Sequence, residues 1–367
     1  MRKSEEFRSR VYTERPDYAD LPSDEKFMAI LGIIATRMKQ HPKAICSYSG
    51  GSDSDILIDL IERARHLLGA PPVRYVFFNT GLELEATKRH VRETAEKYGV
   101  TIEEHRPKKN IVLATREHGQ PFMSKLYSEA IEIMQMKGVP LDIKEEFDAA
   151  ENKKAKREEL QERYPNARTA INFICSCDKY GNFYPNGQIT MAKSAYLYEF
   201  MKANPLPFKV SSRCCQVCKK EVAHRIQKGY DLIITGEREA EGGLRTMTRG
   251  FKEDETACFF STTNGQFRFR PLYYVSDKDK EWYKERWNLK YSDAYEVYGL
   301  KRTGCCGCPI SARAVEDLER IRPYEPNVVK AAWAIFGDSY RYRQEYNAFK
   351  ELMKHTADGQ LTFDDIK

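Results

Sequence analysis

One short run of small and polar residues has the composition of a loop that binds phosphate: Ser49-Gly50-Gly51-Ser52-Asp53-Ser54. Its two glycines tolerate unusual backbone dihedrals and leave room for a ligand oxygen, so successive backbone amides can face an anion. A helix that follows the loop adds its positive N-terminal end. Asp53 can reach a magnesium ion, which prefers oxygen ligands and substrate phosphates. The alternative is an ordinary strand-to-helix turn capped by Ser49 or Ser52.

The ten cysteines are unevenly distributed, and six of them fall in two tight groups: Cys214, Cys215, Cys218 and Cys305, Cys306, Cys308. In a large chain with no export signal, clustered cysteines favour metal ligation or redox chemistry over disulfides. The two groups can close around one metal centre only if the fold brings them together. One tetrathiolate set, suited to zinc, joins Cys215 and Cys218 to Cys305 and Cys308. The separate pair Cys175 and Cys177, in the expected insertion, is interpreted as structural, with a sulfur-carrying pair as the alternative.

Two arginines follow a predicted strand in the second half of the chain. The run from Asp231 to Thr235 is typical of a buried strand, and Arg238 and Arg245 come after it. The loop after a strand of a parallel sheet lies at the carboxyl edge, where open α/β folds bind ligands. Guanidinium groups suit phosphate and sulfate oxygens. The alternative is a pair of surface arginines that balance the neighbouring glutamates.

The elements that must position these residues alternate along the chain. Short apolar runs predict strands at Ala44 to Tyr48, Val73 to Asn79, Val100 to His105 and Asp231 to Thr235. Apolar residues at helical spacing predict helices at Ser23 to Gln40, Asp55 to Leu68, Glu83 to Tyr98 and Lys219 to Lys228. Such alternation predicts an α/β fold with a doubly wound, mostly parallel, Rossmann-like sheet. The phosphate loop then lies between a strand and a helix.

The alternation is interrupted, which divides the chain. We expect a helical lead-in at residues 1–43, a nucleotide-binding domain at 44–310 that contains a helical insertion at 121–208, and a helical C-terminal region at 311–367. The C-terminal region includes an aromatic and basic helix from Pro323 to Lys354. Its rings can pack on the core while its charges face solvent, or the helix can contact nucleic acid.

Bulk composition sets wide bounds on function. The chain has 367 residues, 41% of them hydrophobic, which allows one large core and a second lobe. Its formal charge of +6 is too small to mark a dedicated nucleic-acid binder. The charged N-terminus has no apolar signal region, and no stretch has the length of a membrane span. We therefore expect a cytoplasmic protein without a membrane partner.

The phosphate loop and three further segments resemble a known family. Ser-Gly-Gly-x-Asp-Ser is similar to the signature of the PP-loop ATP pyrophosphatases, and the remaining segments narrow the resemblance to the branch of phosphoadenylyl-sulfate (PAPS) reductases, adenylyl-sulfate reductases and DNA phosphorothioation sulfurtransferases. Those segments are Asn79-Thr80-Gly81, where Asn replaces the Asp of the branch, Thr235-Gly236-Glu237-Arg238 through Arg245, and Arg302-Thr303-Gly304-Cys305. The resemblance covers about residues 44–309 outside the insertion. It implies an adenine nucleotide alpha hydrolase-like fold.

The resemblance also implies site residues. Those expected to bind the nucleotide are Ser49, Gly50, Gly51, Ser52, Asp53, Ser54, Asn79, Thr80, Gly81, Gly236 and Arg238. The catalytic residues it implies are Asp53, Arg238 and Arg245. The pair Cys214-Cys215 with Cys305-x-x-Cys308 resembles the 4Fe-4S ligand set of the adenylyl-sulfate reductases, with Cys218 and Cys306 left over. The resemblance thus favours iron and sulfur, and spacing alone leaves zinc open.

The activity expected from the resemblance is ATP-dependent. The intact loop suits ATP with magnesium, adenylylation of an acceptor, release of pyrophosphate and then sulfur transfer, with nucleic acid as one candidate acceptor and a sulfur-donor protein as a partner. The sulfate reductases use a cysteine near the C-terminus, and this sequence has none after Cys308. One alternative is nevertheless an adenylyl-sulfate or PAPS reductase that uses an internal thiol or a partner thiol-reductant. Another is a non-catalytic nucleotide-binding component of a defence or mobile-element system.

Overall fold

The computed structural model describes residues 15–178, 180–183, 190–242, 256–262 and 264–357. Internal contacts divide the chain into two compact units. The first contains Met1–Pro107 and Glu221–Cys305, and the second contains Lys108–Lys220 and Cys306–Lys367. The expected domain boundaries at residues 43, 121, 208 and 310 remain predictions.

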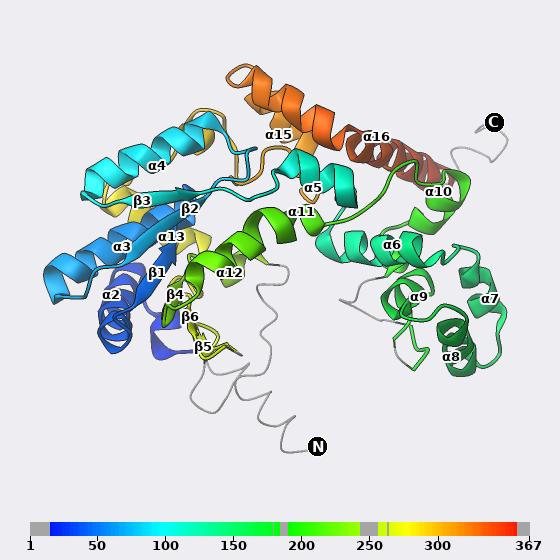
Figure 1. The fold of residues 1–367 in the computed structure, drawn as a ribbon, viewed down its shortest axis with the longest axis horizontal. Helices are drawn as coiled ribbons and strands as arrows, with labels where there is room; N and C mark the ends of the chain where they lie inside the picture. The colour runs from blue at the N-terminus through cyan, green and yellow to red at the C-terminus, as the bar shows by residue number, and fades with distance from the viewer. Residues whose placement is uncertain (1–14, 179, 184–189, 243–255, 263, 358–367) are drawn as a thin grey trace. The chain divides into compact units, whose positions relative to one another are not determined.

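The first unit is built around a six-stranded sheet (Figure 1). Its strands are β1 (Ala44–Ser47), β2 (Arg74–Phe78), β3 (Ile102–His105), β4 (Leu232–Ile234), β5 (Phe259–Ser261) and β6 (Phe267–Phe269). The strand order is β3-β2-β1-β4-β6-β5. All neighbouring pairs are parallel except β5 and β6, which are antiparallel. The predicted mostly parallel, doubly wound α/β sheet is confirmed.

Burial on both faces explains why the central strands are almost wholly apolar. Ile45, Val76 and Ile233 meet on one face, where Ile226 of α12 (Glu221–Gln227) covers them. The opposite face packs against α2 (Ser23–Gln40) and α3 (Ser52–Leu68). Helices on both faces are what a parallel sheet requires, because its crossover connections place them there. The alternating sequence pattern therefore predicted the layers as well as the strands.

Three more helices complete the part of the first unit that surrounds the loop Ser49 to Ser54: α4 (Glu85–Tyr98), α13 (Asp277–Arg286) and α14 (Asp293–Glu296). The predicted strands β1 to β4 and helices α2, α3, α4 and α12 all form, with shifts of a few residues at their ends. Strands β5 and β6 were not predicted. Each has only three residues, and unlike the equally short β4, which is wholly apolar, they include Ser261 and Arg268.

The second unit is helical in its described residues. Its α-helices are α5 (Ile111–His118), α6 (Lys125–Lys137), α7 (Ile143–Ala149), α8 (Lys153–Arg163), α9 (Arg168–Ile174), α10 (Leu197–Ala203), α11 (Arg213–Cys215), α15 (Ala314–Ile321) and α16 (Pro326–Ala357). A core of its own includes Tyr342 and Tyr346 of α16, whose hydroxyls donate to the carbonyls of Asn204 and Ala195. These rings of the aromatic and basic helix therefore pack on the core.

Across the described ranges, no helix is both long enough and apolar enough to pass through a lipid bilayer.

Candidate functional site

The loop Ser49 to Ser54 lies at the point where the strand order of the sheet reverses. Strand β1 has β2 on one side and β4 on the other, and all three are parallel. In open α/β sheets, ligands bind at such a point, outside the carboxyl ends of the strands. The loops that follow β1 and β4 meet there, because a Cβ atom added to Gly236 would lie 3.3 Å from the carbonyl carbon of Asp53. The sheet thus joins two segments that are far apart in sequence.

Both glycines of the loop are required by its surroundings. Gly50 has a φ of 67°, in the left-handed region, and a Cβ atom there would lie 2.9 Å from Cγ2 of Thr87 on α4. Gly51 is the N-cap of α3, and its Cβ atom would lie 3.1 Å from Oγ1 of Thr303 and 3.3 Å from the hydroxyl of Tyr295. The two glycines are buried, whereas Ser49 is exposed. A ligand must therefore reach the loop from the side of Ser49.

Ser54 fixes the shape of the loop. Its hydroxyl accepts from the backbone amide of Gly51 at 3.0 Å, donates to the carbonyl of Gly51 at 2.7 Å and lies 3.1 Å from Oγ of Ser49. These contacts close the turn, so Ser54 acts as a structural member of the loop. The first amides of a helix have no acceptor within the helix, so those at the start of α3 can donate to an anion.

Asp53 is held by two cations. Its Oδ1 accepts from Nε of Arg238 at 2.9 Å and from Nζ of Lys280 at 3.0 Å. Lys280 also donates to Oγ of Ser52 at 2.5 Å. Among the described residues, Oδ2 of Asp53 makes no hydrogen bond. Because Mg²⁺ is commonly bound by one or two carboxylates together with substrate phosphates, this oxygen fits the expected magnesium ligand.

Arg238 reaches the loop as predicted, but its surroundings differ from those of a solvent-facing phosphate clamp. It is 4% exposed and donates to the carbonyl of Val275 at 3.0 Å and to Asp277 at 2.8 Å, in addition to Asp53. Burial alone would lower the pKa of Arg238, but the carboxylates of Asp53 and Asp277 outweigh it and raise that pKa. The guanidinium is therefore positioned to orient Asp53. Arg245 lies outside the described residues.

Asn79, Thr80 and Gly81 form a closed turn at the end of β2. The side chain of Asn79 accepts from the amide of Gly81 at 2.8 Å, and the hydroxyl of Thr80 donates to Glu83 at 2.9 Å. Gly81 has a φ of 94°, and no heavy atom lies within 4 Å of the position of its Cβ. Oγ1 of Thr80 lies 3.4 Å from Sγ of Cys305. Thr80 thus contacts a residue of the predicted metal set.

Three side chains that contact the loop were not among the predicted site residues: Lys280, Tyr295 and Thr303. The sequence marks Lys280 only weakly, because it is one of many charged residues in α13. Thr303 belongs to one of the segments that carry the family resemblance, so that resemblance could have indicated Thr303 as a site residue. The hydroxyls of Tyr295 and Thr303 lie 3.1 Å apart, and burial raises the pKa of Tyr295. Both can therefore act as neutral donors beside Gly51.

A buried network supports the loop from the side of α4. The hydroxyl of Tyr48, at the end of β1, donates to Oδ1 of Asp55 at 2.5 Å, and Nε2 of His90 lies 2.9 Å from the same oxygen. Burial would lower the pKa of His90, but the hydrogen bond and charge of Asp55 outweigh it and raise that pKa. The network joins the strand before the loop, the first turn of α3 and helix α4.

The predicted metal ligands come from different parts of the chain. Cys214 and Cys215 form the end of α11, and Cys218 lies in the π-helical segment Gln216–Lys220, where its thiol donates to the carbonyl of Lys109 at 3.6 Å. Cys305 is the last residue of the first unit, and Cys308 belongs to the second. Within the described ranges, no three His, Cys, Asp or Glu side chains are grouped so as to hold a metal ion. Four thiols have the chemistry that an iron-sulfur cluster or zinc requires, and the ligand set remains a prediction.

The sheet and the loop at its switch point define the first unit as a Rossmann-like α/β fold. Residues 43–170 match the family model described as the phosphoadenosine phosphosulfate reductase domain. The match covers less than half of the chain, and the matched family is named for an enzyme. The match includes the loop and Asn79 to Gly81, and it ends before Arg238 and the clustered cysteines.

Solved structures give distant similarities. The PAPS reductase from Candida auris, in a phosphate complex, is 14% identical over 75% of this chain and 87% of its own, with a TM-score of 0.38. The NH3-dependent NAD synthetase from Campylobacter jejuni is 10% identical, with 90% and 96% coverage and a TM-score of 0.33. The U34-tRNA thiolase NcsA from Methanococcus maripaludis, with its [4Fe-4S] cluster, is 13% identical, with 89% and 80% coverage and a TM-score of 0.35. A search of curated proteins gives no match.

Proposed function

We propose that this protein binds ATP with magnesium at the loop Ser49 to Ser54, transfers the adenylyl group to an acceptor with release of pyrophosphate, and supports sulfur transfer to that acceptor. The observation that carries the proposal is the position of Gly51, which ends the loop after β1 and caps α3 at the switch point of a parallel sheet. Backbone amides at a helix N-terminus in this place are suited to phosphate oxygens.

The residues of the site suggest a division of labour. Ser49, Gly50, Gly51 and the first amides of α3 would bind the phosphates. Oδ2 of Asp53 would coordinate magnesium while Arg238 and Lys280 hold Oδ1, so that the carboxylate cannot rotate away. A magnesium ion beside the phosphates would neutralise the charge that builds up as the bond between the α and β phosphates breaks. Arg245 is proposed to contribute charge at the α-phosphate.

The sulfur-transfer half of the proposal depends on the cysteines. Cys214, Cys215, Cys305 and Cys308 would hold a 4Fe-4S cluster, with zinc on Cys215, Cys218, Cys305 and Cys308 as the alternative. A bound cluster would hold the incoming sulfur or support the fold. The contact of Thr80 with Cys305 supports a link between the nucleotide loop and the metal ligands, because Thr80 follows the strand next to β1.

The adenylylation step can be tested with ATP labelled on the α-phosphate and with magnesium present. We expect release of pyrophosphate and transfer of labelled AMP to an acceptor, with RNA and DNA tested first. Asp53→Asn should abolish the release, whereas the exposed-lysine variant Lys278→Met should keep it. Sulfite formed from adenylyl sulfate in the presence of thioredoxin would instead identify a reductase. Tight ATP binding without either product would identify a non-catalytic nucleotide-binding protein.

A further inference from the structure

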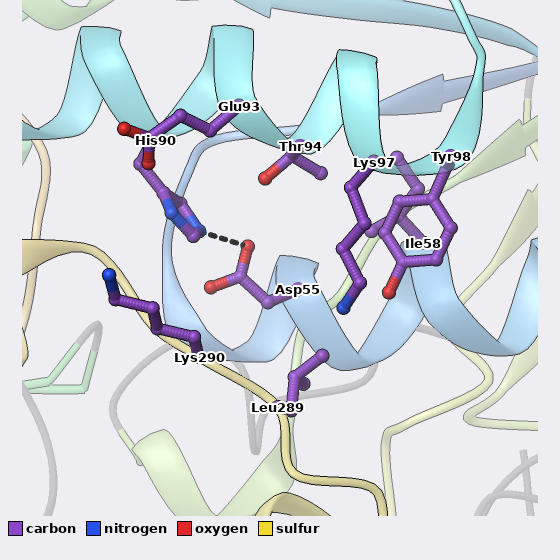
Figure 2. A pocket seen from close by; sticks show the side chains of 9 residues that line it. All are labelled: Asp55, Ile58, His90, Glu93, Thr94, Lys97, Tyr98, Leu289 and Lys290. Atoms are coloured by element: carbon purple, nitrogen blue, oxygen red, sulfur yellow. Dashed lines mark hydrogen bonds and ion pairs between the residues drawn. The ribbon is translucent and has the colours of Figure 1, made fainter.

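A cavity between α3 and α4 in the first unit has no role in the function proposed above (Figure 2). Its volume is about 120 Å³, which corresponds to roughly four water molecules at about 30 Å³ each and so leaves room for a small organic ligand. Its polar walls are formed by Asp55, His90, Glu93, Thr94, Lys97 and Lys290. None of these side chains contacts the loop residues Ser52 and Asp53 in a hydrogen bond or ion pair.

Asp55 presents an unsatisfied oxygen at this cavity. Asp55 is 2% exposed, and its Oδ1 is bonded by Tyr48 and His90. Its Oδ2 is buried and has no hydrogen-bond partner. Figure 2 shows this second oxygen on the side of Asp55 that Lys290 borders. A buried carboxylate oxygen without a partner is costly, so a donor inside the cavity would stabilise it.

Two lysines line the same cavity without an ionic partner. Within the described part of the chain, neither Lys97 nor Lys290 forms an ion pair, and the described contact of Lys97 is with the ring of Tyr98 at 4.8 Å. The Glu93 carboxylate lies 3.8 Å from Nε of Arg89, so the charge of Glu93 is balanced by a residue that does not line the cavity. The cavity therefore offers one strong acceptor on Asp55 and two cations that can receive an anion.

These charges exclude the simplest ligands. A divalent metal ion in the cavity would face the ammonium groups of Lys97 and Lys290. Among the described residues, Asp55, His90 and Glu93 are not grouped so as to hold a metal ion. An inorganic anion would face the buried carboxylate of Asp55. A molecule that carries both an ammonium group and a carboxylate satisfies both demands.

We propose that this cavity binds a small zwitterion of the α-amino acid type, with its ammonium group on Oδ2 of Asp55 and its carboxylate directed to Lys97 and Lys290. The volume suits a ligand of the size of glycine or alanine. The inference does not depend on ATP binding, since Asp53 and Asp55 have different partners: Arg238 and Lys280 for the first, Tyr48 and His90 for the second.

Calorimetric titration of the full chain with glycine and L-alanine tests the proposal, with methylamine and acetate as probes that carry one group each. We expect at least one amino acid to bind about tenfold or more tightly than either single-group probe, because two charge-assisted contacts replace one. Absence of amino-acid binding, or equal binding of methylamine, would overturn the proposal. Displacement of the amino acid by AMP would assign the cavity to the nucleotide and overturn it as well.

Substitutions of residues that line the cavity test whether the amino acid binds there. Lys290→Gln should weaken amino-acid binding several-fold, and Asp55→Asn should weaken it by about tenfold or more, since a charged hydrogen bond is lost. Lys39→Gln is the matched control, because Lys39 is exposed on α2 in the same unit. If Asp55→Asn fails to fold, the result with Lys290→Gln decides. Unchanged binding in Lys290→Gln would contradict the assigned position of the carboxylate.

Discussion

At the scale of single residues, the shape of the loop and its neighbours require glycine at positions 50 and 51. Thr87 of α4 contacts one side of the loop, and Thr303 with Tyr295 contacts the other. A side chain on either glycine would displace one of these neighbours or change the backbone. Substitution at the loop therefore tests the geometry of the anion site without adding or removing charge.

Gly50→Ala is expected to weaken ATP binding by about tenfold or more. The new methyl group would lie against Thr87, and a non-glycine residue in the left-handed region costs about 1–2 kcal/mol. The loop would relieve this strain by changing the direction of its amides. Fluorescent ATP-analogue titration measures the effect.

Gly32→Ala is the matched control for this substitution. Gly32 lies within α2, and no heavy atom lies within 4 Å of the position of its Cβ. Alanine in a helix interior is favoured over glycine by up to about 1 kcal/mol, so this variant should be slightly more stable and should bind ATP normally. Normal ATP binding by Gly50→Ala would show that the loop does not carry the nucleotide.

Lys280→Met is expected to lower the affinity for magnesium ATP by about tenfold, or about 1.4 kcal/mol. The substitution removes a cation from Asp53 and Ser52 and leaves the loop more negative where the phosphates are proposed to bind. Lys280→Arg should restore part of the affinity. Lys278→Met is the control, because Lys278 is an exposed residue of the same helix. Equal affinity in both methionine variants would remove Lys280 from the site.

At the scale of elements, a buried ion pair holds α13, and with it Lys280, against α2. Nζ of Lys26 lies 2.7 Å from Oδ2 of Asp279, and each side chain is 7% exposed. Ser23 donates to the other oxygen of Asp279 at 2.8 Å, and Ser276 caps α13 through the same carboxylate. One aspartate therefore joins the start of α2 to the start of α13.

Lys26→Met is expected to reduce the free energy of unfolding by about 3–5 kcal/mol, because it leaves the carboxylate of Asp279 buried without its cation. Burial would raise the pKa of Asp279, but the hydrogen bonds from Lys26 and Ser276 outweigh it and lower that pKa to about 2. This contribution to stability is present above the unfolded pKa of about 3.9 and is lost as the pH falls toward the folded value.

Urea unfolding at neutral pH and at about pH 3 measures both effects, since about pH 3 lies between the folded and unfolded pKa values. The wild-type protein should lose more stability on acidification than Lys26→Met does, because the variant has already lost the interaction that lowers the pKa of Asp279. Equal losses would show that other carboxylates dominate the acid response. Lys39→Met, an exposed change on the same helix, should match the wild type at both pH values.

At the scale of the whole molecule, the proposed metal ligands come from both units of the chain. The iron-sulfur set and the zinc set share Cys215, Cys305 and Cys308, and they differ in Cys214 and Cys218. The thiol of Cys218 contacts the carbonyl of Lys109. Single substitutions of the two differing residues therefore distinguish the sets.

Cys214→Ser is expected to abolish iron binding after anaerobic purification, whereas Cys218→Ser should retain it, because only Cys214 belongs to the iron-sulfur set. Metal analysis together with the visible absorption of the protein provides the measurement. If the wild type contains zinc and Cys218→Ser loses it while Cys214→Ser does not, the zinc set is correct. Cys46→Ser, a change at a buried residue of β1 that belongs to neither set, is the control.

Prediction from sequence succeeded where a signal was local and repeated. The glycine pair, the apolar runs of β1 to β4 and the helical spacing of α2 to α4 each lie within a few consecutive turns or strand residues. Prediction failed for β5 and β6, which are short, and for Lys280, whose role depends on a fold that brings α13 to the loop. It found Arg238 but not the acceptors that surround it, Val275 and Asp277.

The sequence by itself determined the parallel α/β architecture and the place of Gly50 and Gly51 between a strand and a helix, because hydrophobic periodicity and glycine placement act through neighbouring residues. Only the tertiary structure decided that Arg238 and Lys280 both hold one oxygen of Asp53, that α4 packs against Gly50, and that Asp55 presents a bare oxygen to a cavity. Each of these depends on distances between segments separated by tens to hundreds of residues. Such distances are set by packing of the whole core, which no local pattern encodes.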